Sequence, residues 1–148
     1  MKILIVFAGT YSHIGRLSTH MELMGKGLKK LGHEVDYLSY SSFPRLVQIL
    51  FFGGPTYVFN KLYNGLGNIY SIYILNFIFS IILLYKIYSK KYDLINAHHI
   101  SSAISAALVK RLFNIPVILT IHTYYTHEMV SVGILKKDSF LEKIGIYN

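Results

Sequence analysis

Histidines stand at three places where an apolar run of the chain gives way to small and polar residues. The segments are AGTYSHIG (8–15), AHHISS (97–102) and IHTYYTH (121–127). An imidazole can exchange a proton near neutral pH, hydrogen-bond a ligand or coordinate a metal ion. Each of these histidines could equally be a buried structural residue that only needs a hydrogen-bond partner. A shared site is favoured if the three segments meet at one edge of a sheet.

A metal site is the first chemistry to consider. His98, His99, His122 and His127 could supply imidazoles, but the chain has no HExxH sequence. Adjacent residues of a strand point to opposite faces, so His98 and His99 would not converge on one ion. The absence of cysteine excludes thiolate ligands. The sequence therefore predicts neither a metal ion nor a bound cofactor.

Phosphate binding is the second chemistry to consider. Gly9 and Gly15 enclose a loop in which backbone amides can approach an anion, and the helix that follows has a positive amino terminus. The loop does not match GxGxxG, and Asp36 lies inside the second predicted strand, not at its end. A dinucleotide site is disfavoured because no acidic residue is placed to hold an adenine ribose. An ordinary strand-to-helix turn remains the alternative.

The residues before position 41 have the pattern of a strand, a helix and a second strand. The apolar run 2–9 is typical of a strand covered on both faces. An amphipathic helix follows, with Ser18 or Thr19 as its predicted N-cap and Gly32 as its predicted C-cap. The segment 33–40 alternates apolar and polar side chains as the second strand.

The pattern repeats later in the chain. Residues 93–97 form the next predicted strand, Ser101 or Ser102 is the predicted cap of a helix, and 117–121 is a further strand. A tail helix is expected at 139–146. Together the two units predict one α/β domain over residues 1–148, Rossmann-like and doubly wound, with a mostly parallel sheet and helices on both faces. Ligands bind such sheets beyond the carboxyl ends of the strands.

The segment between the two units is strongly apolar. The sequences GGP (53–55) and GLG (65–67) interrupt the first part, which predicts loops and short helices, and residues 69–85 carry no charge. This length approaches that of a membrane-spanning helix. A helix packed on the sheet is favoured, because a single span between strands of one sheet would divide the domain across a bilayer. A spanning helix is the alternative.

The chain is basic, with 15 Lys and Arg against 7 Asp and Glu and a formal charge of +8. An anionic partner is therefore expected, but the lysines are scattered and no nucleic-acid-binding motif is present, so nucleic acid is disfavoured. Arg45, Phe51, Phe52 and Lys61 instead predict peripheral contact with a membrane surface. A cover from elsewhere in the chain, or an interface with a missing domain, would explain the same residues.

The chain begins with MKILIVFAG, which leads directly into the patterned region without a signal-peptide cleavage site. We therefore expect a cytoplasmic protein, with membrane contact at the inner face.

Two long segments resemble the N-terminal domain of glycosyltransferase family 4, which has the GT-B fold. They are THMELMGKGLKKLGHEV (19–35) and YDLINAHHISSAISAALVKRLFNIPVILTIHTYY (92–125). The spacing of His20 and Gly32 matches, as do the intervals joining Asp93, His98, Pro116 and His122. The resemblance implies a retaining enzyme that moves a sugar from a nucleotide-sugar donor to a lipid-linked or polysaccharide acceptor.

The same resemblance implies roles for individual residues. His122 would hydrogen-bond the donor and help to stabilise the transition state, which makes it the predicted catalytic residue. The loop at Gly15 would approach the donor diphosphate. The sequence departs from the family pattern at Ile14, which replaces the first glycine, and Gly15 stands one residue farther from His20 than in that pattern. The predicted donor- and acceptor-binding residues are Gly9, Gly15, His20, His98 and Thr123.

Family members have a second domain, which carries most nucleotide-sugar contacts and which these 148 residues lack. The resemblance therefore implies an acceptor-side half with little activity alone. A non-catalytic remnant or a membrane-associated interaction module with the same fold is the alternative.

Overall fold

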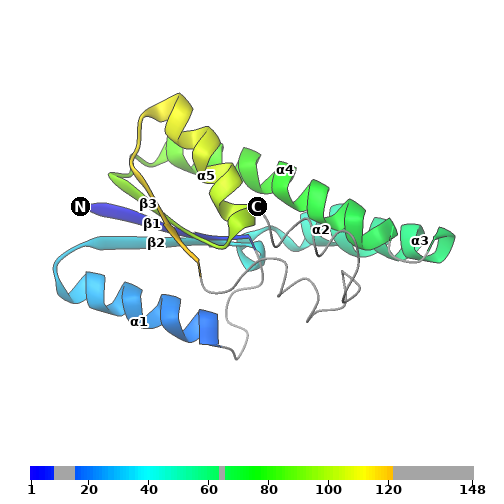
Figure 1. The fold of residues 1–148 in the computed structure, drawn as a ribbon, viewed down its shortest axis with the longest axis horizontal. Coiled ribbons are helices and arrows are strands. Elements are labelled where there is room, and N and C mark those ends of the chain that lie inside the picture. Colours follow the sequence, from blue (N-terminus) through cyan, green and yellow to red (C-terminus); the bar gives the residue numbers. More distant parts are fainter. Residues whose placement is uncertain (9–15, 64–65, 122–148) are drawn as a thin grey trace, which may run out of the picture.

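The core of the molecule is a sheet of four parallel strands (Figure 1). A computed structural model describes residues 1–8, 16–63 and 66–121. The strands lie in the order β2-β1-β3-β4, and every neighbouring pair is parallel. This confirms the Rossmann-like, doubly wound α/β fold expected from the sequence. The strands are β1 (Lys2–Phe7), β2 (Glu34–Ser39), β3 (Leu94–His98) and β4 (Val117–Thr120).

Helices cover both faces of the sheet. Helix α1 lies on one face, whereas α4 and α5 lie on the other (Figure 1). Alternate residues of β1 serve the two cores: Ile5 packs with Met21 on the α1 side, and Leu4 packs with Phe79 on the α4 side. The helices are α1 (Arg16–Lys30), η1 (Tyr40–Ser42), α2 (Arg45–Gln48), η2 (Ile49–Gly53), α3 (Gly54–Leu62), α4 (Leu66–Ser89) and α5 (Ile100–Phe113).

Helix α1 ends as predicted but begins earlier. Gly32 has a φ of 83°, and its N–H donates to the carbonyl of Lys29 while that of His33 donates to Leu28. This paired pattern is a Schellman motif, which glycine favours because it tolerates positive φ. The predicted caps Ser18 and Thr19 are wrong, because α1 already begins at Arg16.

Helix α4 explains the long uncharged segment. Phe79, Leu83 and Ile87 are buried in the core between this helix and the sheet. The hydroxyl of Ser80 lies 2.8 Å from that of Ser105, which joins α4 to α5. The predicted helix on the sheet is therefore confirmed. Within the part of the chain that the structure describes, no helix combines the length and apolar character that crossing a bilayer demands.

Elements α2, η2 and α3 form one continuous helical stretch, which we call the arm (residues 45–62). Gly53 and Gly54 were expected in loops, but both have helical backbone angles. The arm continues because a five-residue π turn, η2, precedes α3 and because Pro55 falls in the first turn of α3, where its missing N–H is tolerated.

One of the predicted membrane-contact residues, Phe52, is buried. Phe52 is only 7% exposed, and its ring lies edge-on to Tyr40 with 4.9 Å between centroids. The prediction of Phe52 as a surface contact is therefore wrong, since the ring anchors the arm to the core. Phe51, its neighbour, is 43% exposed.

The arm is held on α4 by a close approach at Gly67. Its N–H donates to the side-chain oxygen of Asn60 at 2.9 Å. A Cβ at position 67 would overlap the backbone oxygen of Thr56 and come within 2.7 Å of the Asn60 side chain. Gly27, in α1, has open space around the same position.

The two glycines give a matched test. We expect Gly67→Ala to lower the free energy of unfolding by about 2 kcal/mol, because a backbone oxygen cannot move aside. Gly27→Ala should raise it by about 0.5 kcal/mol, since alanine restricts the unfolded chain and favours helix. Urea denaturation measures both. Equal effects of the two substitutions would contradict the close packing of α3 on α4.

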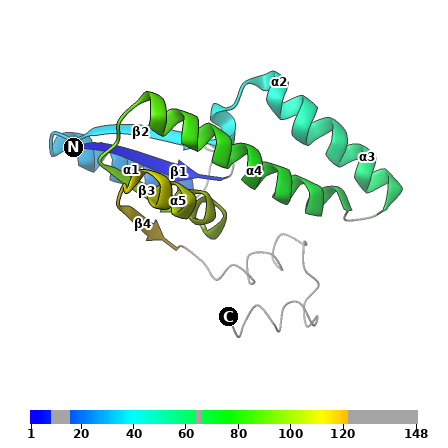
Figure 2. The same ribbon diagram turned by 90° about the horizontal axis from the view of Figure 1, so that it is seen from above.

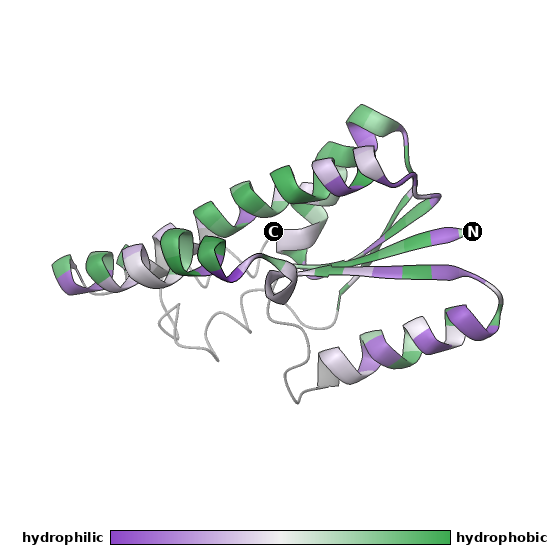
Figure 3. Ribbon diagram, turned by 180° about the vertical axis from the view of Figure 1, so that it is seen from behind, coloured by the Kyte–Doolittle hydropathy of each residue, from purple (hydrophilic) through white to green (hydrophobic). Residues whose placement is uncertain are grey.

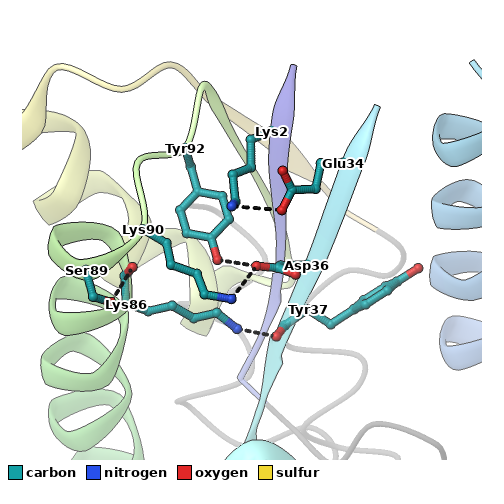
Figure 4. Close-up of polar contacts among 8 residues, drawn as sticks. All are labelled: Lys2, Glu34, Asp36, Tyr37, Lys86, Ser89, Lys90 and Tyr92. Carbon is teal, nitrogen blue, oxygen red and sulfur yellow. Dashed lines mark hydrogen bonds and ion pairs between the residues drawn. The ribbon is translucent and has the colours of Figure 1, made fainter. Parts of the chain in front are cut away.

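A polar cluster holds α4 to the amino half of the sheet (Figure 4). The hydroxyl of Tyr92 donates to the carboxylate of Asp36 at 2.6 Å, and Lys90 lies 3.4 Å from the same oxygen. Lys2 pairs with Glu34 at 2.8 Å. The hydrogen bond from Tyr92 and the charge of Lys90 hold the pKa of Asp36 below its usual value against the opposing effect of burial.

Lys86 completes this cluster. Its ammonium donates to the backbone oxygen of Tyr37 at 2.7 Å (Figure 4). Burial lowers the pKa of Lys86. The pKa values of Asp36 and Lys86 are lowered because α4 docks on the sheet here. Both residues lie away from the carboxyl ends of the strands.

Tyr92→Phe tests the cluster through its pH dependence. Asp36 has a lowered pKa in the folded state. Its ionised carboxylate therefore stabilises the fold above about pH 4, and this stabilisation is lost as the pH falls through the pKa of the folded state. We expect the variant to lose about 1 kcal/mol at pH 7, because the carboxylate is partly exposed, and much less in acid.

Urea denaturation at neutral and acidic pH measures this difference. Tyr85→Phe is the control, since Tyr85 is exposed on α4, the helix that the cluster holds to the sheet. A loss that is the same at both pH values would argue against the bond to an ionised Asp36.

Candidate functional site

The carboxyl edge of the sheet is defined by one row of paired residues. Ser39, Phe7, His98 and Thr120 stand side by side on β2, β1, β3 and β4. Strand β1 leads to β2 on one side and pairs with β3 on the other, so the winding reverses between β1 and β3. This reversal is the place where ligands bind in open α/β sheets.

Two predicted site histidines meet at this reversal. The ring of His98 is fully buried, and its centroid lies 6.0 Å from that of His20, with the planes tilted by 59°. His20 comes from α1 and is exposed. The two residues are far apart in the chain, and the crossover of α1 over its face of the sheet brings them together. One histidine is therefore fixed in the interior while the other faces solvent.

A short series of polar contacts beside His98 links α1, β3 and β4 on one face of the sheet. The side-chain nitrogen of Asn96 lies 3.4 Å from the sulfur of Met24, which places Asn96 on the α1 face. The hydroxyl of Thr120 donates to the side-chain oxygen of Asn96 at 3.0 Å. Asn96 and Thr120 are not among the site residues predicted from the sequence. A polar residue inside an apolar strand is the signal that could have identified Asn96.

His99 adopts a backbone conformation that L-residues rarely occupy. Its φ is 82° and its ψ is 150°, in a region used almost entirely by glycine. The conformation is held at both ends, because the His99 N–H donates to Thr120 at 3.3 Å and its carbonyl accepts from Ala103 at 3.1 Å. Strained residues of this kind gather at functional sites, so His99 marks the carboxyl end of β3 as a candidate.

Helix α5 starts immediately after this strained residue. The predicted caps Ser101 and Ser102 are wrong, because α5 begins at Ile100 with no side-chain cap. The buried hydroxyl of Ser102 instead bonds back to the carbonyl of His98 and lies 3.0 Å from that of His99. It thereby fixes the strand-to-helix turn and leaves the positive amino terminus of α5 at the carboxyl edge.

The charges of the described residues favour an anion at this edge. Of the carboxylates in that part of the chain, Glu22 pairs with Lys26 on α1 at 2.6 Å. Glu34, Asp36 and Asp93 lie in the amino halves of β2 and β3 or just before them. Three of the four described carboxylates thus lie away from the carboxyl edge, and Lys26 offsets the charge of the fourth, which reduces the repulsion of a phosphate.

Comparison with known families decides the relationship. The model of Glycosyltransferase Family 4 matches residues 17–144. The chain belongs to glycosyltransferase family 4. A search of curated proteins found no match. The family match includes α5 and all but the first residue of α1, the two helices that begin at the carboxyl edge, and it confirms the resemblance seen in the sequence.

The remaining predicted site residues of this family member fall outside the described part of the chain. These are Gly9, Gly15, His122 and Thr123. Strands β1 and β4, which lead into their segments, both end at the carboxyl edge. Among the described residues, no group of three His, Asp or Glu side chains is arranged to hold a metal ion.

The strain at His99 can be measured by comparing two substitutions. We expect His99→Gly to be more stable to urea than His99→Ala by about 1 kcal/mol, because only glycine accepts this backbone without strain. Both variants lose the imidazole and its edge-on contact with Phe7, so that loss cancels in the comparison. If alanine proved as stable as glycine, the backbone of residue 99 would be unstrained.

Proposed function

We propose that this chain is the acceptor-side domain of a retaining glycosyltransferase that moves a sugar from a nucleotide-sugar donor to a lipid-linked or polysaccharide acceptor. The observation that supports it most is the meeting of His20 and His98 where the winding of the sheet reverses. The family match supplies the reaction class. Among the described residues, Glu34, Asp36 and Asp93 lie away from the amino terminus of α5, which suits a donor that carries a diphosphate.

Each predicted site residue has a proposed role in this reaction. His122, two residues after the end of β4, hydrogen-bonds the donor sugar and stabilises the charge that develops in the transition state. The backbone at Gly9 and Gly15 approaches the diphosphate. His20 and Thr123 contact the donor or the acceptor, and the buried His98 orients His20.

The partners follow from this reaction. The nucleotide-sugar is a substrate, and the proposal requires neither a cofactor, nor a metal ion, nor nucleic acid. A second domain of the GT-B type closes the cleft and holds the nucleotide. The enzyme acts in the cytoplasm at the inner face of the membrane. Catalysis by positioning needs both walls of the cleft, so residues 1–148 alone should transfer no sugar above background.

The test joins residues 1–148 to a GT-B donor-binding domain and measures sugar transfer. We expect His122→Ala to lower kcat at least ~100-fold, as loss of one transition-state donor does, and to leave the unfolding temperature within about 1 °C. His33→Ala is the control, since His33 lies at the opposite edge of the sheet, before β2.

Two outcomes would overturn the proposal. One is robust transfer by residues 1–148 alone. The other is full activity of His122→Ala in the joined protein. A large loss of stability in that variant would instead assign His122 a structural role.

A further inference from the structure

The arm carries apolar side chains on the face that it turns to solvent. Its inner side is buried through Phe52 and half-buried Val47, which pack in the core beside α4. Many exposed residues of the arm are also apolar, whereas the exposed side of a helix in a soluble domain normally carries polar residues. Figure 3 colours these apolar residues green along the ribbon. An exposed apolar surface of this extent marks a place of contact. Its exposed members include Leu46, Ile49, Leu50, Tyr57, Val58 and Leu62.

The charge of this segment indicates which kind of partner binds the outer face of the arm. The sequence contains no Asp or Glu between Asp36 and Asp93, whereas Arg45 and Lys61 are exposed at the two ends of the arm. A second copy of the chain would bring like charges together, which costs free energy. An anionic lipid surface instead pairs with both cations while the apolar residues between them enter the acyl boundary.

Exposed tyrosines agree with a lipid interface. Tyr57 lies on the outer side of α3, and Tyr63 follows its last residue. A tyrosine presents an apolar ring and a polar hydroxyl, and it is enriched where hydrocarbon meets water. The arm therefore carries the three residue types of an interfacial helix, which are aliphatic, aromatic and cationic.

The position of the arm connects this surface to the site. Strand β2 ends at the carboxyl edge, η1 follows it directly, and the arm extends beyond the ends of the strands (Figures 1 and 2). Helix α4 then returns to the opposite edge, where β3 begins. The carboxyl edge with His20 and His98 is therefore the edge from which the arm projects.

We propose that the arm inserts its outer face into the interface of an anionic bilayer and holds the carboxyl edge of the sheet at that surface. The arm lies in the plane of the membrane, with Leu50 and Leu62 in the acyl boundary and Arg45 and Lys61 at the headgroups. It follows that the acceptor is lipid-linked, not a soluble polysaccharide. Only this last step rests on the proposed function.

Vesicle co-sedimentation of the 148-residue chain tests the insertion. The vesicles consist of phosphatidylcholine alone or of phosphatidylcholine mixed with phosphatidylglycerol. We expect binding to the mixed vesicles, and we expect Leu50→Asp with Leu62→Asp to weaken it at least ~100-fold, because each substitution removes a leucine from the acyl boundary and adds a charge.

The control pair is Leu23→Asp with Leu112→Asp, which should bind as the unchanged chain does. Leu23 and Leu112 are 63% and 61% exposed on α1 and α5, compared with 57% and 73% for Leu50 and Leu62. All four side chains are at the surface, so each variant is expected to fold, and circular dichroism checks this.

The contribution of the basic residues to vesicle binding is tested by a second double variant with its own control. We expect Arg45→Gln with Lys61→Gln to weaken binding to mixed vesicles by about 30-fold, since each basic residue near such a surface contributes about fivefold. Lys29→Gln with Lys30→Gln removes the same charge from the end of α1 and should have little effect. The difference between the pairs should shrink at high salt.

Three results would overturn the proposal. They are equal binding to neutral and mixed vesicles, equal loss in the arm and control pairs, and a stable dimer in solution that the Leu50→Asp and Leu62→Asp pair dissociates. Failure here leaves the proposed sugar transfer intact, because that rests on His122 and is measured in the joined protein. Transfer to a soluble polysaccharide in preference to a lipid-linked acceptor would overturn the acceptor assignment alone.

Discussion

The parallel pairing of β1 with both β2 and β3 is the constraint on which the rest of the structure depends. A parallel pair cannot be joined by a tight turn, so every connection must cross the sheet and bring the chain back to the amino edge. All strands therefore deliver their carboxyl ends to one side. Residues as distant in sequence as His20 and His98 meet there because α1 and β3 both have to pass the same edge.

That pairing also sets the chemistry of the helices. The strands are covered on both faces, so β1 is apolar on both, and the helices above it must supply matching surface. Helix α4 meets this demand with Phe79, Leu83 and Ile87. The polar cluster around Asp36 fixes the carboxyl-terminal end of α4, and the aromatic contacts of Phe52 fix the arm to the core. Helix α4 is thus firmly docked on the face of the sheet opposite α1.

The sequence predicted the strands, the long helix and the end of α1, because these depend on local patterns such as the apolar run of β1 and the glycine at position 32. It failed where tertiary structure overrides such patterns. Ser102 has the residue type of a cap, yet the strained His99 starts α5 earlier and turns that hydroxyl back to the strand. Phe51 and Phe52 are alike in sequence, and only the packing against Tyr40 shows which is buried. The contact of His20 with His98 depends on the crossover, which no spacing in the sequence reveals.

The π turn η2 is equivalent to one residue inserted into an α-helix. Each residue of an α-helix advances the direction of the side chains by about 100°, so winding the same five residues as α-helix, without the π turn, would rotate all of α3 relative to α2 by about that angle. Phe59 would then leave the ring of Tyr70, now 4.8 Å away. The helical phase at this point therefore decides which side chains of α3 belong to the protein interior and which to its surroundings.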